Sequence, residues 1–265
     1  MGDRSLKRYE FSFKTKLKFQ NKISNQHFML KCLPGEYQFQ RIYDEKISVL
    51  PEVNCSFNKD SFGNRTISGS IKDKHELFEY KVAGKALLSS YKSTEILDRI
   101  FLYETHSTTM SKEMEDFTLS IPEEDSVQKQ AISVSHAVYN KIEYVLESTD
   151  TETTASKAFH QGKGVCQDYA HITIALLRNL KIPARYCAGL MMGEGKTHAW
   201  VEYYDGSSWY GIDPTNDQII EYGYIKISSG RDCSDCTVDR GCFVSENKEV
   251  QQEIQISAKV GEING

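Results

Sequence analysis

Three residues in the second half of the chain have the types and the order that thiol chemistry requires. Cys166 follows two closely spaced glycines, His198 opens an apolar segment, and Asp213 stands directly before a proline. A cysteine attacks a carbonyl carbon as its thiolate, an imidazole takes the proton and later returns it, and a carboxylate orients the imidazole. The set therefore indicates nucleophilic acyl transfer by a Cys-His-Asp triad.

The element expected to carry the cysteine is a buried helix. Apolar residues between Tyr169 and Leu180 predict a helix that begins at Cys166 and ends before Pro183. Cys166 then lies in the first helical turn, where free backbone N–H groups and the helix dipole favour a thiolate.

The other two residues are expected on a hairpin. Segments 198–204 and 209–212 are β-type, and residues 205–208 form a turn between them. Since the start of one hairpin strand lies beside the end of its partner, His198 and Asp213 are expected at the same end of the sheet.

Each residue also has an ordinary structural explanation. A cysteine in a helix is usually a small buried side chain. His198 could be a strand histidine with satisfied hydrogen bonds, and an aspartate before proline commonly starts a turn. Three placements at the edges of elements, in this order, favour the triad.

The remainder of the chain predicts an α+β architecture. Short alternating runs between Pro, Gly and Asn turns predict an all-β, sandwich-like N-terminal domain over residues 1–90. Residues 91–125 are expected to connect it to a catalytic domain at 126–265, which ends in further strands. That domain opens with an amphipathic helix whose apolar face runs from Val127 to Val145, and helices precede adjacent antiparallel strands.

Composition excludes several classes of protein. The 265 residues are 39% apolar and carry a net charge of −5, so a core is expected and no basic stripe for nucleic acid is present. No apolar run is long enough for a membrane span, and no secretory leader is visible, so a cytoplasmic location is expected. Seven cysteines, an odd number, argue against a disulfide framework.

Three sequence blocks carry a resemblance to a known family. They are GKGVCQDYAH at 162–171, HAWVE at 198–202 and DPTN at 213–216. These blocks resemble the transglutaminase-like superfamily, most closely its bacterial branch of candidate cysteine proteases with a β-rich N-terminal domain. The resemblance implies a papain-like α+β core, in which a central helix carries the cysteine against an antiparallel sheet.

The resemblance also implies roles and reactions. Cys166 is the nucleophile, His198 the base and Asp213 the orienting carboxylate. Reactions of the superfamily form a thioester from a glutamine carboxamide or a peptide bond. An amine resolves it by crosslinking, or water resolves it by deamidation or proteolysis. The expected partners are a polypeptide substrate and, for crosslinking, an amine co-substrate, and no cofactor is implied. The competing hypothesis is a non-catalytic protein-interaction module that keeps the fold.

Supporting residues are assigned around the triad. The backbone N–H of Cys166 is expected to form half of an oxyanion hole, with the side chain of Gln161 as a candidate for the other half. Gly164, Gln167 and Trp200 are candidates for the substrate cleft, although packing also explains a hairpin tryptophan.

A second group of cysteines departs from the family pattern. Cys233, Cys236 and Cys242 follow a Gly-Arg-Asp segment, and a C-x-x-C pair invites a zinc or redox interpretation. A closed zinc site needs four ligands, and only these three cysteines are close together in the sequence. Cys187 could be the fourth ligand only if the fold brings it near them. The alternative is three small residues in a β segment, and no metal site is expected.

Overall fold

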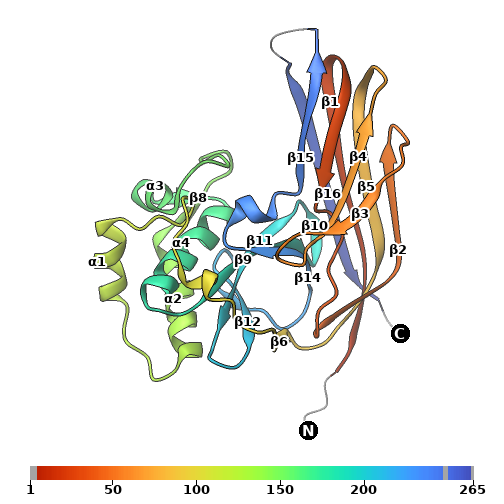
Figure 1. Ribbon diagram of the computed structural model, residues 1–265. Coiled ribbons are helices and arrows are strands. Elements are labelled where there is room, and N and C mark those ends of the chain that lie inside the picture. Colours follow the sequence, from red (N-terminus) through yellow and green to blue (C-terminus); the bar gives the residue numbers. More distant parts are fainter. Residues whose placement is uncertain (1–4, 247–249, 264–265) are drawn as a thin grey trace.

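The structure is a computed structural model that describes residues 5–246 and 250–263. Figure 1 shows a large curved sheet on one side of the molecule and a group of helices on the other, with a smaller sheet between them. Among the described residues, none of the helices combines the length and the apolar character that crossing a membrane requires.

One long strand, β1 (Lys7–Leu30), organises the large sheet. Its buried residues alternate with more exposed ones, as expected for a strand with one face in a core. The register of its pairing shifts between Lys18 and Ile23, so its two halves have different main neighbours. The first half pairs with β5 (His75–Leu88) and β16 (Gln252–Glu262), and the second half pairs with β4 (Arg65–Ile71) and β15 (Asp239–Ser245).

Three further strands extend the sheet. They are β2 (Gln40–Leu50) on β5, β3 (Ser56–Lys59) on β4, and β10 (Gly193–Gly195) on β16. All eight strands belong to one continuous antiparallel sheet, and not to the two stacked sheets that a sandwich implies. A single strand that serves both halves explains the difference, because the sheet curves at β1 and does not divide there.

The last two strands of the chain join this N-terminal sheet. The sequence-based division placed them in the catalytic region that begins at residue 126. In the structure β15 and β16 both pair with β1, more than two hundred residues upstream. This pairing satisfies the backbone N–H and C=O groups along the edges of β1. The local sequence of β15 and β16 does not indicate which strand they pair with.

The helical group contains four α-helices among the described residues. They are α1 (Lys112–Ser120), α2 (Val127–Lys141), α3 (Ala155–Gln161) and α4 (Cys166–Asn179). The hydroxyl oxygens of Ser111, Ser126 and Thr154 cap the first three by accepting a backbone N–H in the first turn. Helix α4 is buried by the other three and by the smaller sheet. The segment expected to be a connection thus contains helix α1 and a 3-10 turn, η1 (Arg99–Leu102).

The smaller sheet supports α4 from the other side. In order its strands are β13 (Gln218–Ile219), β12 (Trp209–Asp213), β11 (His198–Tyr204), β9 (Ala184–Met191) and β14 (Tyr224–Gly230), with β6 (Lys92–Ser93) on β12. Strands β11 and β12 form the predicted hairpin, and α4 packs on β11 and β9. A short parallel pair, β7 (Glu143–Tyr144) and β8 (Lys163–Gly164), lies beside the start of α4.

The two sheets share a core. Leu190, Ile225 and Ile227 of the smaller sheet pack among the aromatic and aliphatic side chains of the large one. The contact is also polar, because the Asn64 side chain donates to the carbonyl of Ser229 and accepts its N–H, both at 2.9 Å. The β-rich region therefore fixes the position of β9 and β14, which border the site described next.

Candidate active site

Cys166 is the first residue of α4, as its sequence environment predicts. The first N–H groups of an α-helix have no partner within the helix, so the positive end of the dipole lies at this thiol. The side chain is half-buried and lines a cleft. The N-terminal end of α4 therefore presents Cys166 to the cleft.

The turn before α4 is held by the carboxylate of Asp168. One of its oxygens accepts the N–H of Val165 at 2.8 Å and the hydroxyl of Thr149 at 2.6 Å. A Cβ added at Gly164 would lie 2.6 Å from the Cβ of Asp168, which is too close for two carbons. Burial raises the pKa of Asp168, although these hydrogen bonds oppose the change. The glycine is thus required for the closure of this turn.

His198 and Asp213 meet at one end of the hairpin, as the strand order predicts. The Nε2 atom of His198 lies 2.7 Å from Oδ2 of Asp213, and Cys166 is close enough to the ring to contribute to its raised pKa. With Nε2 facing the carboxylate, Nδ1 is the nitrogen left for the sulfur. Burial disfavours the protonated ring, but the hydrogen bonds and charges of Asp213 and Cys166 outweigh it and raise the pKa of His198 to about 9.

The carboxylate of Asp213 is fully buried, and both of its oxygens accept hydrogen bonds. Oδ2 also accepts the hydroxyl of Tyr224 at 2.6 Å and the side-chain amide of Asn216 at 2.7 Å, and Oδ1 accepts the backbone N–H of Thr215 at 2.9 Å. Burial raises the pKa of Asp213, yet the bonds from His198 and its neighbours lower it overall. The carboxylate is therefore ionised, and its orientation toward His198 is fixed.

The cleft in front of Cys166 and His198 has a volume of about 650 Å³. Its walls come from the start of α4, from β9 and β11, and from the segment that follows β14. The residues nearest the pair along the chain, Gln167 and Thr197, both line it. The space is large enough for a segment of substrate, and both reactive side chains face it.

Three of the expected supporting residues lie outside the cleft. Trp200 is fully buried, and its indole N–H donates to the hydroxyl of Tyr91 at 2.9 Å, so its assignment to the cleft is wrong. Gln161 ends α3 and is exposed, outside the residues that line the cleft. Gly162, with φ of 66°, ends that helix in the left-handed conformation and turns the chain away. Gly164 contacts Asp168 and likewise does not line the cleft.

Cys233 and Cys236 border the cleft in a 3-10 turn, η2 (Cys233–Cys236), and not in the expected β segment. The carboxylate of Asp232 starts this turn by accepting the N–H of Ser234 at 2.8 Å. Cys242 is exposed on β15. Within residues 5–246 and 250–263, no three His, Cys, Asp or Glu side chains are placed to hold a metal ion, so the zinc interpretation gains no support there.

Several residues of the site had no assigned role from sequence. Tyr224 comes from β14, about ten residues beyond the hairpin, and no local pattern marks it. His171 lies in α4, and its Nε2 accepts the backbone N–H of Cys233 at 3.1 Å. Burial lowers the pKa of His171 to about 4, Asp232 opposes this and Arg178 adds to it. The neutral ring therefore holds η2 against α4.

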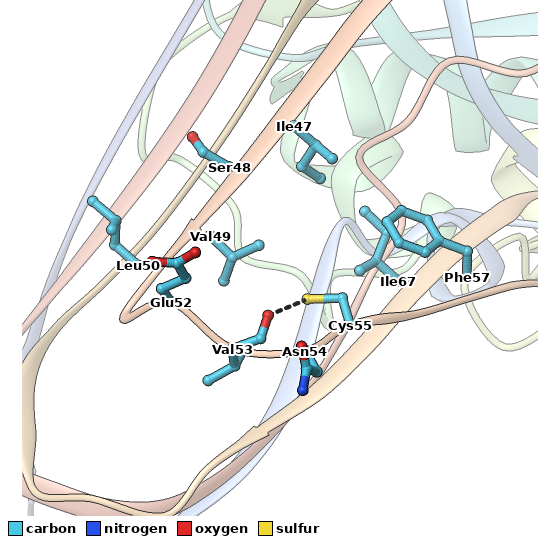
Figure 2. A pocket seen from close by; sticks show the side chains of 10 residues that line it. All are labelled: Ile47, Ser48, Val49, Leu50, Glu52, Val53, Asn54, Cys55, Phe57 and Ile67. Carbon is cyan, nitrogen blue, oxygen red and sulfur yellow. Dashed lines mark hydrogen bonds between the residues drawn. The ribbon is translucent and has the colours of Figure 1, made fainter.

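A hollow in the β-rich region offers no comparable chemistry. Figure 2 shows that it surrounds Cys55, whose thiol donates to the carbonyl of Val53 at 3.7 Å. Burial raises the pKa of Cys55, and the ten residues that line the hollow include no histidine. The cleft at Cys166 is the better candidate.

Two family models match the chain. Residues 116–214, which include Cys166, His198 and Asp213, match the transglutaminase-like superfamily. Residues 9–86 match the bacterial transglutaminase-like N-terminal region. The two matches fall on the helices and hairpin of the site and on the strands β1 to β5, respectively.

Curated relatives are known from mycobacteria. An uncharacterized protein of Mycobacterium leprae is 29% identical over 190 residues, which are 67% of each chain. An uncharacterized protein of Mycobacterium bovis is 31% identical over 137 residues, 45% of this chain and 44% of that one. The match spans less than half the length of the second relative.

Among solved structures, a candidate cysteine protease from Cytophaga hutchinsonii is similar over nearly the whole chain. The TM-score is 0.82 at 20% identity, with 98% of this chain and 92% of the other covered. At this identity the likeness concerns the fold, which is transglutaminase-like with a β-rich N-terminal region, four helices and curved antiparallel sheets.

Proposed function

The chain carries the core of the transglutaminase-like superfamily behind a bacterial transglutaminase-like N-terminal region, and on this premise we propose that it performs cysteine-dependent acyl transfer or hydrolysis on polypeptide amides. The observation that carries the proposal is the hydrogen-bonded pair of His198 and Asp213 beside Cys166, with Cys166 and His198 both at the wall of an open cleft. A non-catalytic module with a closed site would not need a buried, ionised carboxylate behind the imidazole.

The first half-reaction follows from the arrangement. The Cys166 thiolate attacks the carbonyl carbon of a glutamine carboxamide or a peptide bond, and the oxyanion forms near the N–H groups at the start of α4. The imidazolium of His198 gives its proton to the departing nitrogen, so ammonia or an amine leaves. The product is a thioester on Cys166 and a neutral imidazole.

The second half-reaction reverses the proton movement. Neutral His198 takes a proton from a primary amine or from water as either attacks the thioester carbon. The thiolate leaves and pairs again with the imidazolium. An amine gives a crosslink, and water gives deamidation or proteolysis. Asp213 positions the ring through both steps and stabilises its charge.

The test of the proposal is a timed reaction with iodoacetamide near neutral pH, with the label located by mass spectrometry. Cys166 should be alkylated faster than Cys32 and Cys55. His198→Ala should lower the alkylation rate of Cys166 and leave the rates of the other two cysteines unchanged. Equal alkylation rates at the three thiols, or an alkylation rate at Cys166 that is the same in His198→Ala as in the unaltered protein, would show that the thiolate–imidazolium pair does not exist.

The outcome of turnover needs a separate measurement. Candidate polypeptides are incubated with the protein and a labelled primary amine, and the masses of the products are measured by mass spectrometry. Incorporation of the label indicates crosslinking, conversion of glutamine to glutamate indicates deamidation, and shorter fragments indicate proteolysis. An unreactive Cys166 together with none of these products would favour the interaction module.

A further inference from the structure

A second cavity opens directly beside the cleft, on the inner face of the large sheet. Its volume is about 460 Å³, and it shares the residues Thr151, Thr197 and Val238 with the cleft. Thr197 immediately precedes His198, so the common wall lies on the imidazole side of the site. The cavity is therefore adjacent to the position that a molecule bound at Cys166 would occupy.

Most of the cavity wall is apolar. Strand alternation places Phe13, Leu17 and Phe19 of β1 on the inner face, where they line the cavity, and leaves the intervening lysines on the other face. Phe243 of β15 and Ile254 of β16 complete the wall. Such walls suit the hydrocarbon stem of a side chain.

One charged group is present within this apolar lining. Asp239, the first residue of β15, lines the cavity, and its Oδ2 atom is buried without a hydrogen-bond partner. Burial raises the pKa of Asp239 to about 6, so at neutral pH the carboxylate is mostly charged. Asp239 as a whole is only partly buried, but a charged oxygen buried without a partner is unfavourable, and a bound cation would offset this.

The nearest cations along the paired strands are used elsewhere. Lys31, whose backbone N–H donates to Val238, has its ammonium 2.7 Å from Asp60. Arg240 donates to the carbonyl of Ser234 on the outer side. Among the described residues, no ion pair includes the Asp239 carboxylate, so it is available to a cation carried by a ligand.

We propose that this cavity is a recognition subsite for a lysine-type side chain of the polypeptide substrate. The methylene stem lies between the aromatic side chains, and the terminal ammonium pairs with Asp239. An amine held there as the ammonium has no free electron pair, so the subsite recognises the substrate and does not supply the attacking nucleophile. The inference rests on the proposed thiol chemistry at Cys166.

The test uses chloroacetamides whose amide nitrogen carries a tail. The Cys166 thiolate forms an S–C bond, the C–Cl bond breaks, and chloride leaves, so the rate at Cys166 reports how well the tail is placed. A series of ω-aminoalkyl tails of increasing length is compared with alkyl tails of equal length. At one or two lengths the ammonium tail should accelerate labelling of Cys166 by roughly tenfold, as expected for a charge-assisted contact.

A variant then assigns the effect to the carboxylate. Asp239→Asn keeps the shape of the side chain and should abolish the preference for the ammonium tail, while the rate with unsubstituted chloroacetamide stays the same. Glu76→Gln, which removes an exposed carboxylate of β5, is the matched control and should keep the preference. Thermal unfolding checks that both variants are folded, and the comparison of tails in the unaltered protein does not depend on them.

The outcomes separate the two proposals. If unsubstituted chloroacetamide does not react preferentially at Cys166, the proposal that Cys166 is the nucleophile is overturned. If it does react there, but ammonium and alkyl tails of every length label at the same rate, the subsite proposal is overturned. A preference that survives in Asp239→Asn overturns it as well.

Discussion

The proton on His198 is the residue-scale feature on which the proposed chemistry depends most directly. The ring lies between two groups that carry negative charge in the reactive state, Asp213 behind it and Cys166 in front. Both stabilise the imidazolium, and the burial of the ring is the opposing effect. The result is a histidine that stays protonated well above the ordinary value for its type, so it can act as the acid that releases the first product.

A direct prediction concerns the titration of this ring. The NMR signal of the His198 Cε1–H, assigned by its absence in His198→Ala, should titrate with a midpoint near pH 9. Asp213→Asn removes the buried charge and should lower the midpoint by about 1–3 units. Tyr224→Phe removes only a hydrogen bond to the same oxygen and should leave the midpoint nearly unchanged. An identical midpoint in Asp213→Asn would mean that the carboxylate does not hold the proton.

The same shift has a consequence for stability. The pKa of His198 is raised on folding, so its protonation stabilises the folded state fully below the ordinary value, about 6.5. This contribution is lost as the pH rises through about 9. Urea unfolding of the unaltered protein should therefore show a decrease in stability between neutral pH and pH 9 that is smaller in His198→Gln. If the free energy of unfolding depends on pH equally in the two proteins, His198 is not the group whose raised pKa stabilises the folded state.

At this scale the sequence located the three candidate catalytic residues but not the residues that support them. Cys166, His198 and Asp213 stand at the edges of predictable elements, so local patterns were sufficient to bring them together. Tyr224 reaches Asp213 from a strand whose position depends on the whole smaller sheet. Trp200, a candidate for the cleft with packing as the alternative, is a packing residue; the alternation of buried and exposed residues could not decide this, because both faces of β11 are buried.

At the scale of elements, the start of α4 positions the thiol. Strand β8 pairs with β7, and the chain then turns sharply around the Asp168 side chain before the helix begins. The turn fits only because Gly164 has no side chain. The close contact between Gly164 and Asp168 therefore fixes how the chain enters α4, while the packing of α4 on β9 and β11 fixes the helix relative to the hairpin.

Gly164→Ala should disturb both the fold and the site. The added carbon would lie 2.6 Å from Cβ and 2.8 Å from Oδ2 of Asp168, so the cap of α4 must move. Loss of the cap and overpacking together should lower the free energy of unfolding by roughly 2–4 kcal/mol. Urea denaturation measures this, and alkylation of Cys166 should slow at the same time. Gly195→Ala, where the added carbon has nothing within 4 Å, should change neither quantity.

The sequence predicted the elements better than their partners. Helices α2, α3 and α4 and the β11–β12 hairpin follow from apolar periodicity, Ser/Thr caps and one turn, all of which are local. The pairing of β15 and β16 with β1 is set by contacts across the entire chain. A strand sequence specifies which face is buried but not which edge it joins, so these two strands could not be assigned to the N-terminal sheet in advance.

At the scale of the molecule, a buried charge network joins the two regions. Glu202 of the hairpin is fully buried and pairs with Lys226 at 2.9 Å and with Arg185. Burial raises the pKa of Glu202, but these two cations and the Tyr91 hydroxyl lower it to about 2. The ammonium of Lys226 lies 3.9 Å from the ring centre of Tyr37, in the segment between β1 and β2. The network therefore connects the hairpin that carries His198 to the β-rich region.

Lys226→Met should destabilise both regions together. It leaves Glu202 with one cation fewer in a fully buried position, and removal of one partner of a buried pair typically costs about 3–5 kcal/mol. Both tryptophans lie on the β11–β12 hairpin of the smaller sheet, so their fluorescence reports the unfolding of that region. Pulsed alkylation of Cys32, which is buried in the core of the large sheet, reports the unfolding of that sheet. The two urea transitions should coincide in the unaltered protein and move to lower urea by the same amount in the variant.

The shared core explains why one substitution should act on both signals. Side chains of β9 and β14 pack inside the large sheet, so neither region can open without exposing apolar surface of the other. Lys259→Met is the matched control, because it breaks the exposed pair between β16 and Glu194 and should leave both midpoints in place. If Lys226→Met lowers only the tryptophan transition and leaves the protection of Cys32 unchanged, the β-rich region folds independently. The cavity beside the cleft would then lie on a separable domain, and its alignment with Cys166 would depend on domain docking.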